Sequence, residues 1–319
     1  MPDPSRGWKP SHAILLLMMV LLNGWTPTAA RDAMAELPAL SAGFVRFFSA
    51  GLLLSLTVLV LHKAGRKWRR IEKQDYGRFL LAAVLCVPIN QATFLLGVQY
   101  ANASHAGLFY GLNPVLVYII TVSLGHAVLN VRMSLAALLA FLGAAVVGWD
   151  GFQIDTDGNF VLGDLLLFGA VLSWAVYSVV AKPLSAKYGA VRALAIVIMV
   201  GSVIYAPVWL VDGHRFDLTT LSSRGWAGLL FITVGTSYLN YLLWLVAMNR
   251  IDINRLAVIV NISPIVAVIF AYYWRNEPIS TYLVLGAALI FTAIGLANWD
   301  RLRVLFFGPR QDSSASANA

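Results

Sequence analysis

The sequence predicts an all-α integral membrane protein with about ten transmembrane helices, arranged as two inverted five-helix repeats. Three observations lead to this fold class. The 319 residues are 59% hydrophobic and only 12% charged, whereas soluble domains carry roughly 25% charged residues. The apolar residues form runs of roughly 18–25, the length that crosses a bilayer as a helix. The two halves of the chain also resemble each other.

Five apolar runs predict the helices of the first half. They cover about 12–30, 39–62, 78–99, 103–125 and 131–149. The first could also be a cleaved signal peptide, but the repeat needs it as a helix. Strands are excluded because apolar and polar residues do not alternate along these runs.

Five further runs predict the helices of the second half. They cover about 162–181, 190–211, 225–248, 255–274 and 280–299. The predicted division of the chain is therefore a first repeat over 1–150, a second over 151–300 and a tail over 301–319. The tail is expected to be cytoplasmic and disordered, because it ends in small polar residues.

Basic residues predict the orientation in the membrane. Eighteen Lys and Arg fall on the side that holds the N-terminus, and four fall on the opposite side: Arg31, Arg215, Arg224 and Arg275. Such an excess marks the cytoplasmic face. An even number of helices then places both termini in the cytoplasm, with the protein in the plasma (inner) membrane. The basic run 63–73 is expected to bind the lipid surface electrostatically, not nucleic acid.

An internal repeat appears at an offset of 150 residues. Pro114 aligns with Pro264, and Trp149-Asp150 aligns with Trp299-Asp300 in the same ungapped register. Each half carries five predicted helices, and an odd number threads the second half in the opposite sense. Inverted repeats are typical of transporters, because two like halves can exchange conformations around a central site.

Several motifs resemble the EamA-like branch of the drug/metabolite transporter superfamily. They are Gly163-Asp164 running on to Ser173–Tyr177 in the sixth helix, Arg46-Phe47 in the second, Asn113-Pro114 in the fourth, Ile262-Ser263-Pro264 in the ninth and Asn276-Glu277-Pro278 before the tenth. The resemblance covers about residues 12–300. It implies ten helices and the export or exchange of small metabolites. Asn276 departs from the pattern, since the family usually has glycine before that glutamate.

The predicted function is an inner-membrane transporter, an exporter or exchanger of small metabolites such as amino acids, with alternating access at a central cavity. A nucleobase, nucleoside, vitamin-like or drug-like flat molecule is the alternative substrate. A membrane-embedded enzyme or a channel is the alternative from another class. No catalytic, nucleotide-binding or metal-binding motif is visible, so no enzyme activity, catalytic residue, metal or cofactor is expected. The expected partners are the substrate and the lipid bilayer, with the protein a monomer or a homodimer.

Arg46 lies about two turns inside the second predicted helix. A charge at that depth is costly and suggests a role. The residue could contact substrate, but a structural or gating role is favoured, either by reaching the headgroups or by hydrogen-bonding helix ends.

Two helix-breaking patterns predict substrate contacts and hinges. Asn90 and Gln91 follow Pro88, and their amides could line a cavity or bond to a neighbouring helix. Pro114 and Pro264 occupy equivalent places in the two halves and are expected to be hinges, with a packing kink as the alternative. The polar residues before them are candidates for substrate binding: Tyr110, Asn113 and Asn261.

Aromatic residues of the first, sixth and eighth helices predict a cavity wall. The set comprises Trp25, Trp174, Tyr177, Tyr238 and Tyr241, with Thr26 and Asn240 beside them. Interfacial anchoring is the alternative role.

The remaining candidates are structural or gating residues. His105 opens the fourth predicted helix, where a solvated position is favoured over a gate. Glu277 follows from the family resemblance alone. The fifteen acidic residues all fall in loops or near helix ends, with Asp164 the one most nearly inside a span. This placement argues against a mid-membrane carboxylate as a proton relay.

Overall fold

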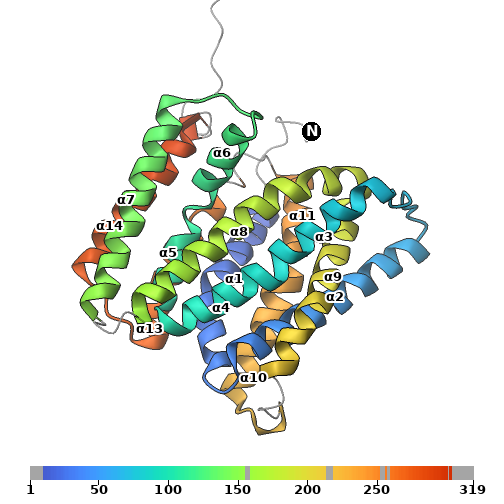
Figure 1. Ribbon diagram of the computed structural model, residues 1–319, viewed down its shortest axis with the longest axis horizontal. Coiled ribbons are helices and arrows are strands. Elements are labelled where there is room, and N and C mark those ends of the chain that lie inside the picture. Colours follow the sequence, from blue (N-terminus) through green and yellow to red (C-terminus); the bar gives the residue numbers. More distant parts are fainter. Residues whose placement is uncertain are drawn as a thin grey trace, which may run out of the picture.

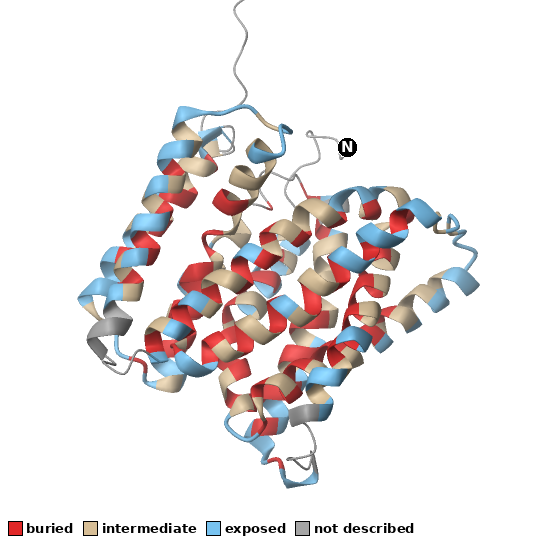
Figure 2. Cartoon of the chain, viewed as in Figure 1, coloured by how far each residue is buried: buried red, intermediate tan, exposed pale blue. Residues whose placement is uncertain are grey.

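The computed structural model describes residues 10–154, 159–212, 218–251, 256, 259–300 and 302–303. Every regular element in these ranges is helical, as predicted. Within them, seven helical spans are long and apolar enough to cross a membrane, and a bent pair of helices makes an eighth. Large apolar side chains such as Leu17 and Leu165 are exposed. Figure 2 shows exposed residues along the outer helices of the bundle. An apolar outer surface fits a lipid environment and would be a liability in water.

The helices follow the predicted order through both halves (Figure 1). The first half contains α1 (Pro10–Met34), α2 (Ala39–Lys63), η1 (Lys73–Asp75), α3 (Tyr76–Val84), η2 (Leu85–Ile89), α4 (Asn90–Tyr100), α5 (Ala103–Tyr110), α6 (Asn113–Ser123) and α7 (Val131–Ile154). The second contains α8 (Asn159–Tyr188), α9 (Ala190–Asp212), η4 (Leu218–Thr220), α10 (Ser223–Leu230), η5 (Phe231–Leu239), α11 (Asn240–Arg250), α13 (Ser263–Arg275) and α14 (Thr281–Ala297).

Two of the predicted spans contain a π-helical segment, η2 in the third span and η5 in the eighth. Pro88 lies inside η2, where its missing N–H interrupts the α-helical ladder. The hydroxyl of Ser173 on α8 donates to the carbonyl oxygen of Leu85 at 2.7 Å, which gives this disturbed turn a partner from another helix. Pro88 therefore lies where the regular α-helical hydrogen bonding of the third span is interrupted.

Both halves contain a helix that starts at a proline after a break. The predicted span 103–125 consists of α5 and α6, which meet at an angle of 40°. Pro114 lies in the first turn of α6, and Pro264 lies in the first turn of α13. Proline is tolerated there because the first N–H groups of a helix have no intrahelical acceptor. The equivalent places of the two prolines agree with the repeat.

Some predicted boundaries are wrong. The segment 150–161 is expected to be a loop, but α7 continues to Ile154 and α8 begins at Asn159. α8 also extends seven residues beyond its expected end, to Tyr188. Charged and polar residues lowered the apparent apolar length of these helices. The tail 301–319 lies outside the described residues, except for Leu302 and Arg303.

α7 and α14 lie side by side at one edge of the bundle (Figure 1). Ala136, Ala140 and Ala144 of α7 are small and buried, and small residues allow helices to approach closely. A Cβ added at Gly286 of α14 would lie 2.5 Å from Cγ2 of Val147. The same Cβ would lie 2.8 Å from the backbone oxygen of Gly143 on α7, so the two backbones approach each other where no side chain fits.

Gly286→Ala is expected to lower the free energy of unfolding by about 1–3 kcal/mol, because the added methyl group overpacks this contact. Gly295→Ala on the same helix is the matched control, since nothing lies within 4 Å of a Cβ at that position. Thermal unfolding of the purified variants in detergent measures both. Equal midpoints for the two variants would contradict the close contact.

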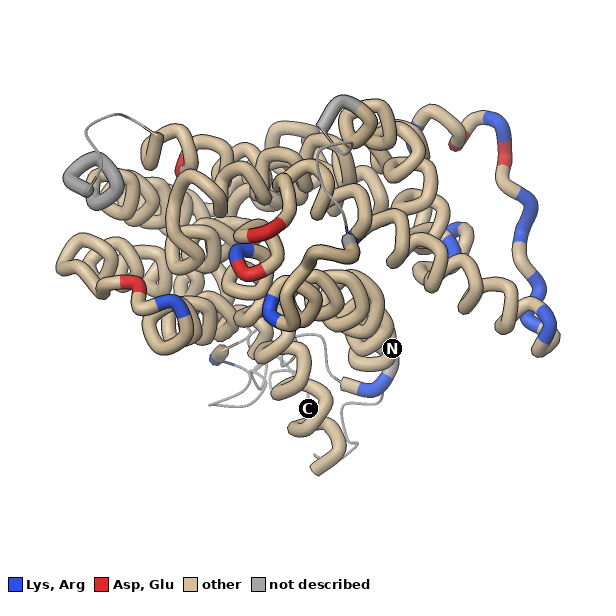
Figure 3. The backbone as a smooth tube through the Cα atoms, turned by 90° about the horizontal axis from the view of Figure 1, so that it is seen from below, with Lys and Arg blue, Asp and Glu red and all other residues tan. Residues whose placement is uncertain are grey.

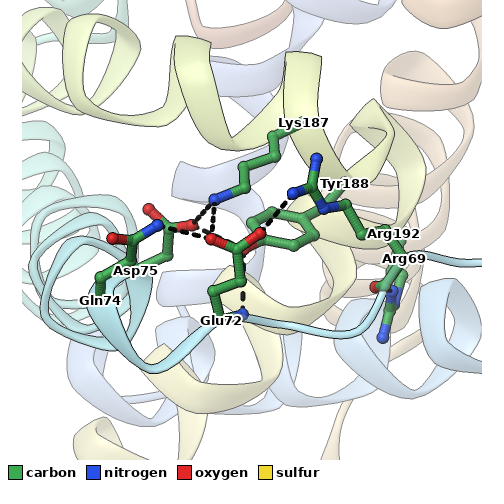
Figure 4. Close-up of polar contacts among 7 residues, drawn as sticks. All are labelled: Arg69, Glu72, Gln74, Asp75, Lys187, Tyr188 and Arg192. Carbon is green, nitrogen blue, oxygen red and sulfur yellow. Dashed lines mark hydrogen bonds and ion pairs between the residues drawn. The ribbon is translucent and has the colours of Figure 1, made fainter.

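A polar cluster connects the basic loop after α2 to the corner between α8 and α9. Figure 3 shows basic residues along this loop. Lys187 Nζ lies 2.7 Å from Glu72 Oε2 and 2.6 Å from Asp75 Oδ2 (Figure 4). The Tyr188 hydroxyl donates to Asp75 at 2.6 Å. The Lys187 ammonium holds the pKa of Glu72 below its usual range. This cluster joins the first half of the chain to the second, far from the bundle centre.

Candidate functional site

A cavity of about 260 Å³ lies between the two halves of the chain. Residues of α1, α2, α4, α5, α6, α8, η5, α11 and α13 line it. Its polar side chains are Asn23, Thr26, Arg46, Asn90, Gln91, Tyr110, Asn113, Trp174, Thr236, Asn240, Tyr241, Asn261 and Ser263. A cavity lined by apolar and aromatic residues with several polar side chains suits a small metabolite.

The cavity brings together most of the residues that the sequence predicts for it. Nine of the twelve candidate contacts line it: Thr26, Asn90, Gln91, Tyr110, Asn113, Trp174, Asn240, Tyr241 and Asn261. Arg46, Pro114 and Pro264 line it as well. Their position in a shared cavity is a structural fact, whereas substrate contact and hinge motion remain predictions.

Three predicted aromatic contacts lie elsewhere. Trp25 packs edge-on against Phe270 and Trp274, with ring centroids 4.5 and 4.8 Å away. Tyr177 lies behind Trp174, at 5.0 Å between centroids, and is buried. The Tyr238 hydroxyl hydrogen-bonds that of Thr57 at 2.9 Å. The expectation of a cavity wall that includes these three rings needs correction. Neighbouring residues on a helix point about 100° apart, so Trp25 and Thr26 face different surroundings.

Asn23 and Thr236 line the cavity but are not among the candidates predicted from the sequence, whereas Ser263 belongs to the predicted break before Pro264. Asn23 precedes Thr26 by three residues and Pro27 by four, so the three share one face of α1. That spacing could have identified Asn23. Its Oδ1 accepts from Asn240 Nδ2 at 3.0 Å, and thereby connects α1 to α11 across the cavity wall. No pattern in the sequence marks Thr236. Only the fold brings its hydroxyl group to 2.9 Å from that of Thr26.

Among the described residues that line the cavity, Arg46 is the one with a positively charged side chain. Only 5% of its surface is exposed, so it does not reach a headgroup as one alternative supposed. Its Nε donates to Ser237 Oγ at 2.7 Å, and its Nη1 donates to Gln91 Oε1 at 3.1 Å. Ser237 belongs to the second half and Gln91 to the first. The guanidinium is thus held in place by both halves.

Asn90 and Gln91 form a continuous hydrogen-bonded chain beside Arg46. Gln91 Nε2 donates to Asn90 Oδ1 at 2.6 Å, and Asn90 Nδ2 donates to the carbonyl oxygen of Ala170 at 2.7 Å. Both amides line the cavity and also bond to a neighbouring helix, Asn90 to α8 and Gln91 to Arg46 on α2. Their partners fix which way each amide faces.

His105 is buried rather than solvated, which corrects the favoured expectation. Its Nδ1 lies 2.9 Å from Asp164 Oδ1, and the two side chains are 1% and 5% exposed. The ring also packs against Phe160 at 5.0 Å between centroids. Helix α5 turns this side chain toward α8, and a charge-assisted hydrogen bond at such burial joins the two helices firmly.

The family of the chain follows from its match to a family model. The model of the EamA-like transporter family matches residues 11–149 and again residues 161–299. The chain belongs to the EamA-like transporter family. Two consecutive matches also show its two-repeat architecture. It is therefore a multi-pass membrane transporter.

Relatives of this EamA-like protein are named as transporters. An uncharacterized transporter of Archaeoglobus fulgidus is 25% identical over 90% of this chain and 96% of its own length. The uncharacterized transporter YvbV of Bacillus subtilis is 26% identical over 91% of this chain and 92% of its own length. A probable biotin transporter of Pseudomonas aeruginosa is 28% identical over 75% of this chain and 83% of its own length. A solved crystal structure has a TM-score of 0.62 at 16% identity and covers 93% of this chain and 100% of its own, which supports the fold.

Glu277, at the EamA motif before α14, contacts the start of α5 and the end of α1. Its carboxylate accepts hydrogen bonds from the backbone N–H groups of Ala103 and Ser104, both at 3.0 Å, and from Arg31 Nη1 at 3.2 Å. It therefore caps the N-terminus of α5, where a negative charge is favourable. Asn276 has φ = 53°, a left-handed conformation that favours glycine and that asparagine tolerates. Asn276 thus adopts the backbone conformation that the glycine usual in the EamA pattern favours.

A second ion cluster at this end gathers around Asp32, at the end of α1. Its Oδ1 accepts from Arg224 Nε at 3.0 Å and from Arg275 Nη1 at 2.9 Å, and its Oδ2 accepts from the Trp274 indole at 2.8 Å. We call the contacts of Glu277 and Asp32 the latch. In the sequence, Arg224 and Arg275 are recognisable only as charges on the side opposite the N-terminus. In the fold they connect α1 to α10 and α13 of the second EamA repeat.

Proposed function

We propose that this transporter exports or exchanges a small polar metabolite, such as an amino acid, by alternating access at the central cavity. The observation that carries the proposal is the composition of the cavity, where amides, hydroxyl groups and one arginine from both repeats face a common space. Pro114 and Pro264 would serve as hinges, because the helix breaks before them lie at the cavity in both halves. The two repeats, over about 1–150 and 151–300, would rock about this space.

A flat, vitamin-like substrate is the second candidate. Trp174 and Tyr241 lie in the cavity with ring centroids 6.2 Å apart and an interplanar angle of 32°, a wall on which a flat molecule could stack. The relative in Pseudomonas aeruginosa is named a probable biotin transporter. Both candidates use the same cavity.

The proposed orientation places both termini and the basic loop after α2 in the cytoplasm. The excess of Lys and Arg in the cytoplasmic segments supports it. The latch then lies at the outer end, and the cluster of Lys187 with Glu72 and Asp75 lies at the inner end. The second repeat would be threaded oppositely to the first.

Trp174→Ala and Asn113→Ala are expected to reduce flux at least about tenfold without loss of membrane-inserted protein, because each removes a cavity side chain and leaves the helices intact. Counterflow in proteoliposomes measures flux, and trans-stimulation by unlabelled substrate separates a carrier from a channel. Trp299→Ala, which is half exposed on the outside, is the matched control for the tryptophan. Unchanged flux in both cavity variants would remove the proposed site.

A further inference from the structure

The cavity contains a buried cation without a carboxylate partner. Arg46 lines the cavity with 5% of its surface exposed, and none of the described residues that line the cavity is Asp or Glu. An arginine stays charged at any physiological pH. A buried, unpaired charge is expensive, so such groups are normally paired with an ion of the opposite sign.

The geometry of the guanidinium leaves its outer edge available. Nε and one N–H of Nη1 are occupied by Ser237 and Gln91. Nη2 makes no hydrogen bond to any residue that the structure describes. Because the fork of a guanidinium matches the two oxygens of a carboxylate, the Nη1–Nη2 edge is a ready anion site that the protein itself leaves unfilled.

Two unpaired acceptors accompany this donor edge. Asn113 Oδ1 and Asn240 Oδ1 are buried at the cavity, and neither has a hydrogen-bond partner among the described residues. Buried oxygens without partners are uncommon in folded proteins. They call for N–H or O–H groups from a ligand. The cavity therefore offers an anion site together with acceptor oxygens.

We propose that the substrate is a small monocarboxylate that also carries an N–H donor, and that its carboxylate docks on Arg46. This inference rests on the proposed function and narrows it to a substrate class. One cation in the lining balances one negative charge, which favours a monocarboxylate over a phosphate ester. Biotin and the amino acids other than aspartate and glutamate carry one carboxylate and N–H groups, whereas free nucleobases carry no carboxylate and are excluded.

The test compares free acids with their primary amides on the purified protein. The probes are the proteinogenic amino acids, biotin and their amides, and binding is read as thermal stabilisation in detergent, because a ligand that binds the native state raises the midpoint. At least one acid should stabilise the protein with an apparent affinity at least about tenfold tighter than its amide. Equal binding of acid and amide, or no binding by any acid, would overturn the inference.

Two variants connect the preference to Arg46. Gln91→Glu keeps the size of the side chain and places an internal carboxylate against Arg46, but it loses the hydrogen bond that Gln91 Nε2 donates to Asn90 Oδ1. It should remove the preference for the acid while the protein still folds, which its unfolding midpoint without ligand checks. Arg46→Gln should do the same where it folds. Gln99→Glu, exposed on the same helix α4, and Arg78→Gln, exposed on α3, are the matched controls and should retain the preference. An acid preference that survives in Gln91→Glu would overturn the assignment to Arg46.

Flux separates this inference from the proposed function. Counterflow of the acid that binds supports both. Binding of that acid without any flux would contradict export or exchange of this substrate class while leaving the anion site intact. Flux of amides as fast as that of the acids would contradict the anion site while leaving the transporter function intact.

Discussion

Replacing Glu277 with alanine is expected to lower the free energy of unfolding by about 2–4 kcal/mol, one of the largest effects in this chain. The carboxylate is 6% exposed and accepts from two backbone N–H groups, the Ser104 hydroxyl and Arg31. Its removal leaves the first N–H groups of α5 unpaired within the protein, and each such buried donor costs free energy. Arg31 is a quarter exposed, so water solvates it in part and limits the loss.

Thermal unfolding in detergent, followed by tryptophan fluorescence, measures this effect. Glu277→Gln should fall between wild type and alanine, because the amide keeps one acceptor oxygen but turns an NH₂ group toward a donor. Asp300→Ala is the control, since its ion pair with Arg132 lies on an exposed surface where such pairs contribute little. A midpoint for Glu277→Ala that matches Asp300→Ala would show that the cap is not needed.

The fold class could be predicted because it follows from local properties of the chain. Apolar runs of spanning length require helices, since a lipid environment leaves no other partner for the backbone. Proline has a local effect on the backbone that the sequence reveals directly. Pro114 and Pro264 were predicted to break helices in equivalent places, and each lies in the first turn of a helix in the structure. Helix ends such as Ile154 were less predictable, because helices extend beyond the apolar region that reveals them.

The cavity was predictable in part for the same reason. Polar residues within apolar runs cost free energy in lipid unless they face an interior, and this reasoning found Asn90, Gln91 and Asn240. Pairings between helices could not be predicted. His105 and Asp164 are 59 residues apart, and only the packing of α5 against α8 joins them. The same holds for Asp32 and its two arginines, whose distances along the chain give no sign of contact.

The aromatic residues show a second limit. Trp25 and Trp174 look alike in sequence, since each lies deep in its span near the start of a repeat. In the fold, Trp174 faces the cavity and Trp25 packs against Phe270 and Trp274. Which face of a helix points inward depends on its rotation, and nearly uniform apolarity around these helices leaves that rotation unmarked. For these tryptophans, the depth in the membrane can therefore be inferred from the sequence, but the side of the helix on which each ring lies cannot.

Replacing Asp32 with asparagine is expected to open the latch end of the transporter. Asp32 is 5% exposed, and its carboxylate accepts hydrogen bonds from Arg224, Arg275 and the Trp274 indole, all in the second repeat. The substitution keeps the size of the side chain but leaves Arg224 and Arg275 close to each other without an anion, so the closed arrangement loses attraction and gains repulsion. Alternating access requires this end to open, and a loss of 1.4 kcal/mol shifts such an equilibrium about tenfold.

Cysteine labelling measures the shift directly. Cys86 is fully buried and is replaced by alanine, and Ser263→Cys then places one thiol in the cavity lining. A membrane-impermeant thiol reagent, applied to oriented vesicles from the latch side, should react about tenfold faster in Asp32→Asn than in the parent. From the opposite side the reaction should slow, because a population that opens at one end closes at the other.

Glu36→Gln is the matched control for this experiment. Glu36 lies four residues after Asp32, and its carboxylate accepts from the backbone N–H and hydroxyl of Ser222, which also belongs to the second repeat. Those donors are neutral, so the amide leaves no cations facing each other, and the rate of labelling should change little. Equal acceleration from both sides in Asp32→Asn would mean that the bundle had loosened as a whole, and an unchanged rate would mean that the Asp32 cluster does not hold the latch closed. Only acceleration confined to the latch side connects the charge of this one carboxylate to the alternation between the two faces of the membrane.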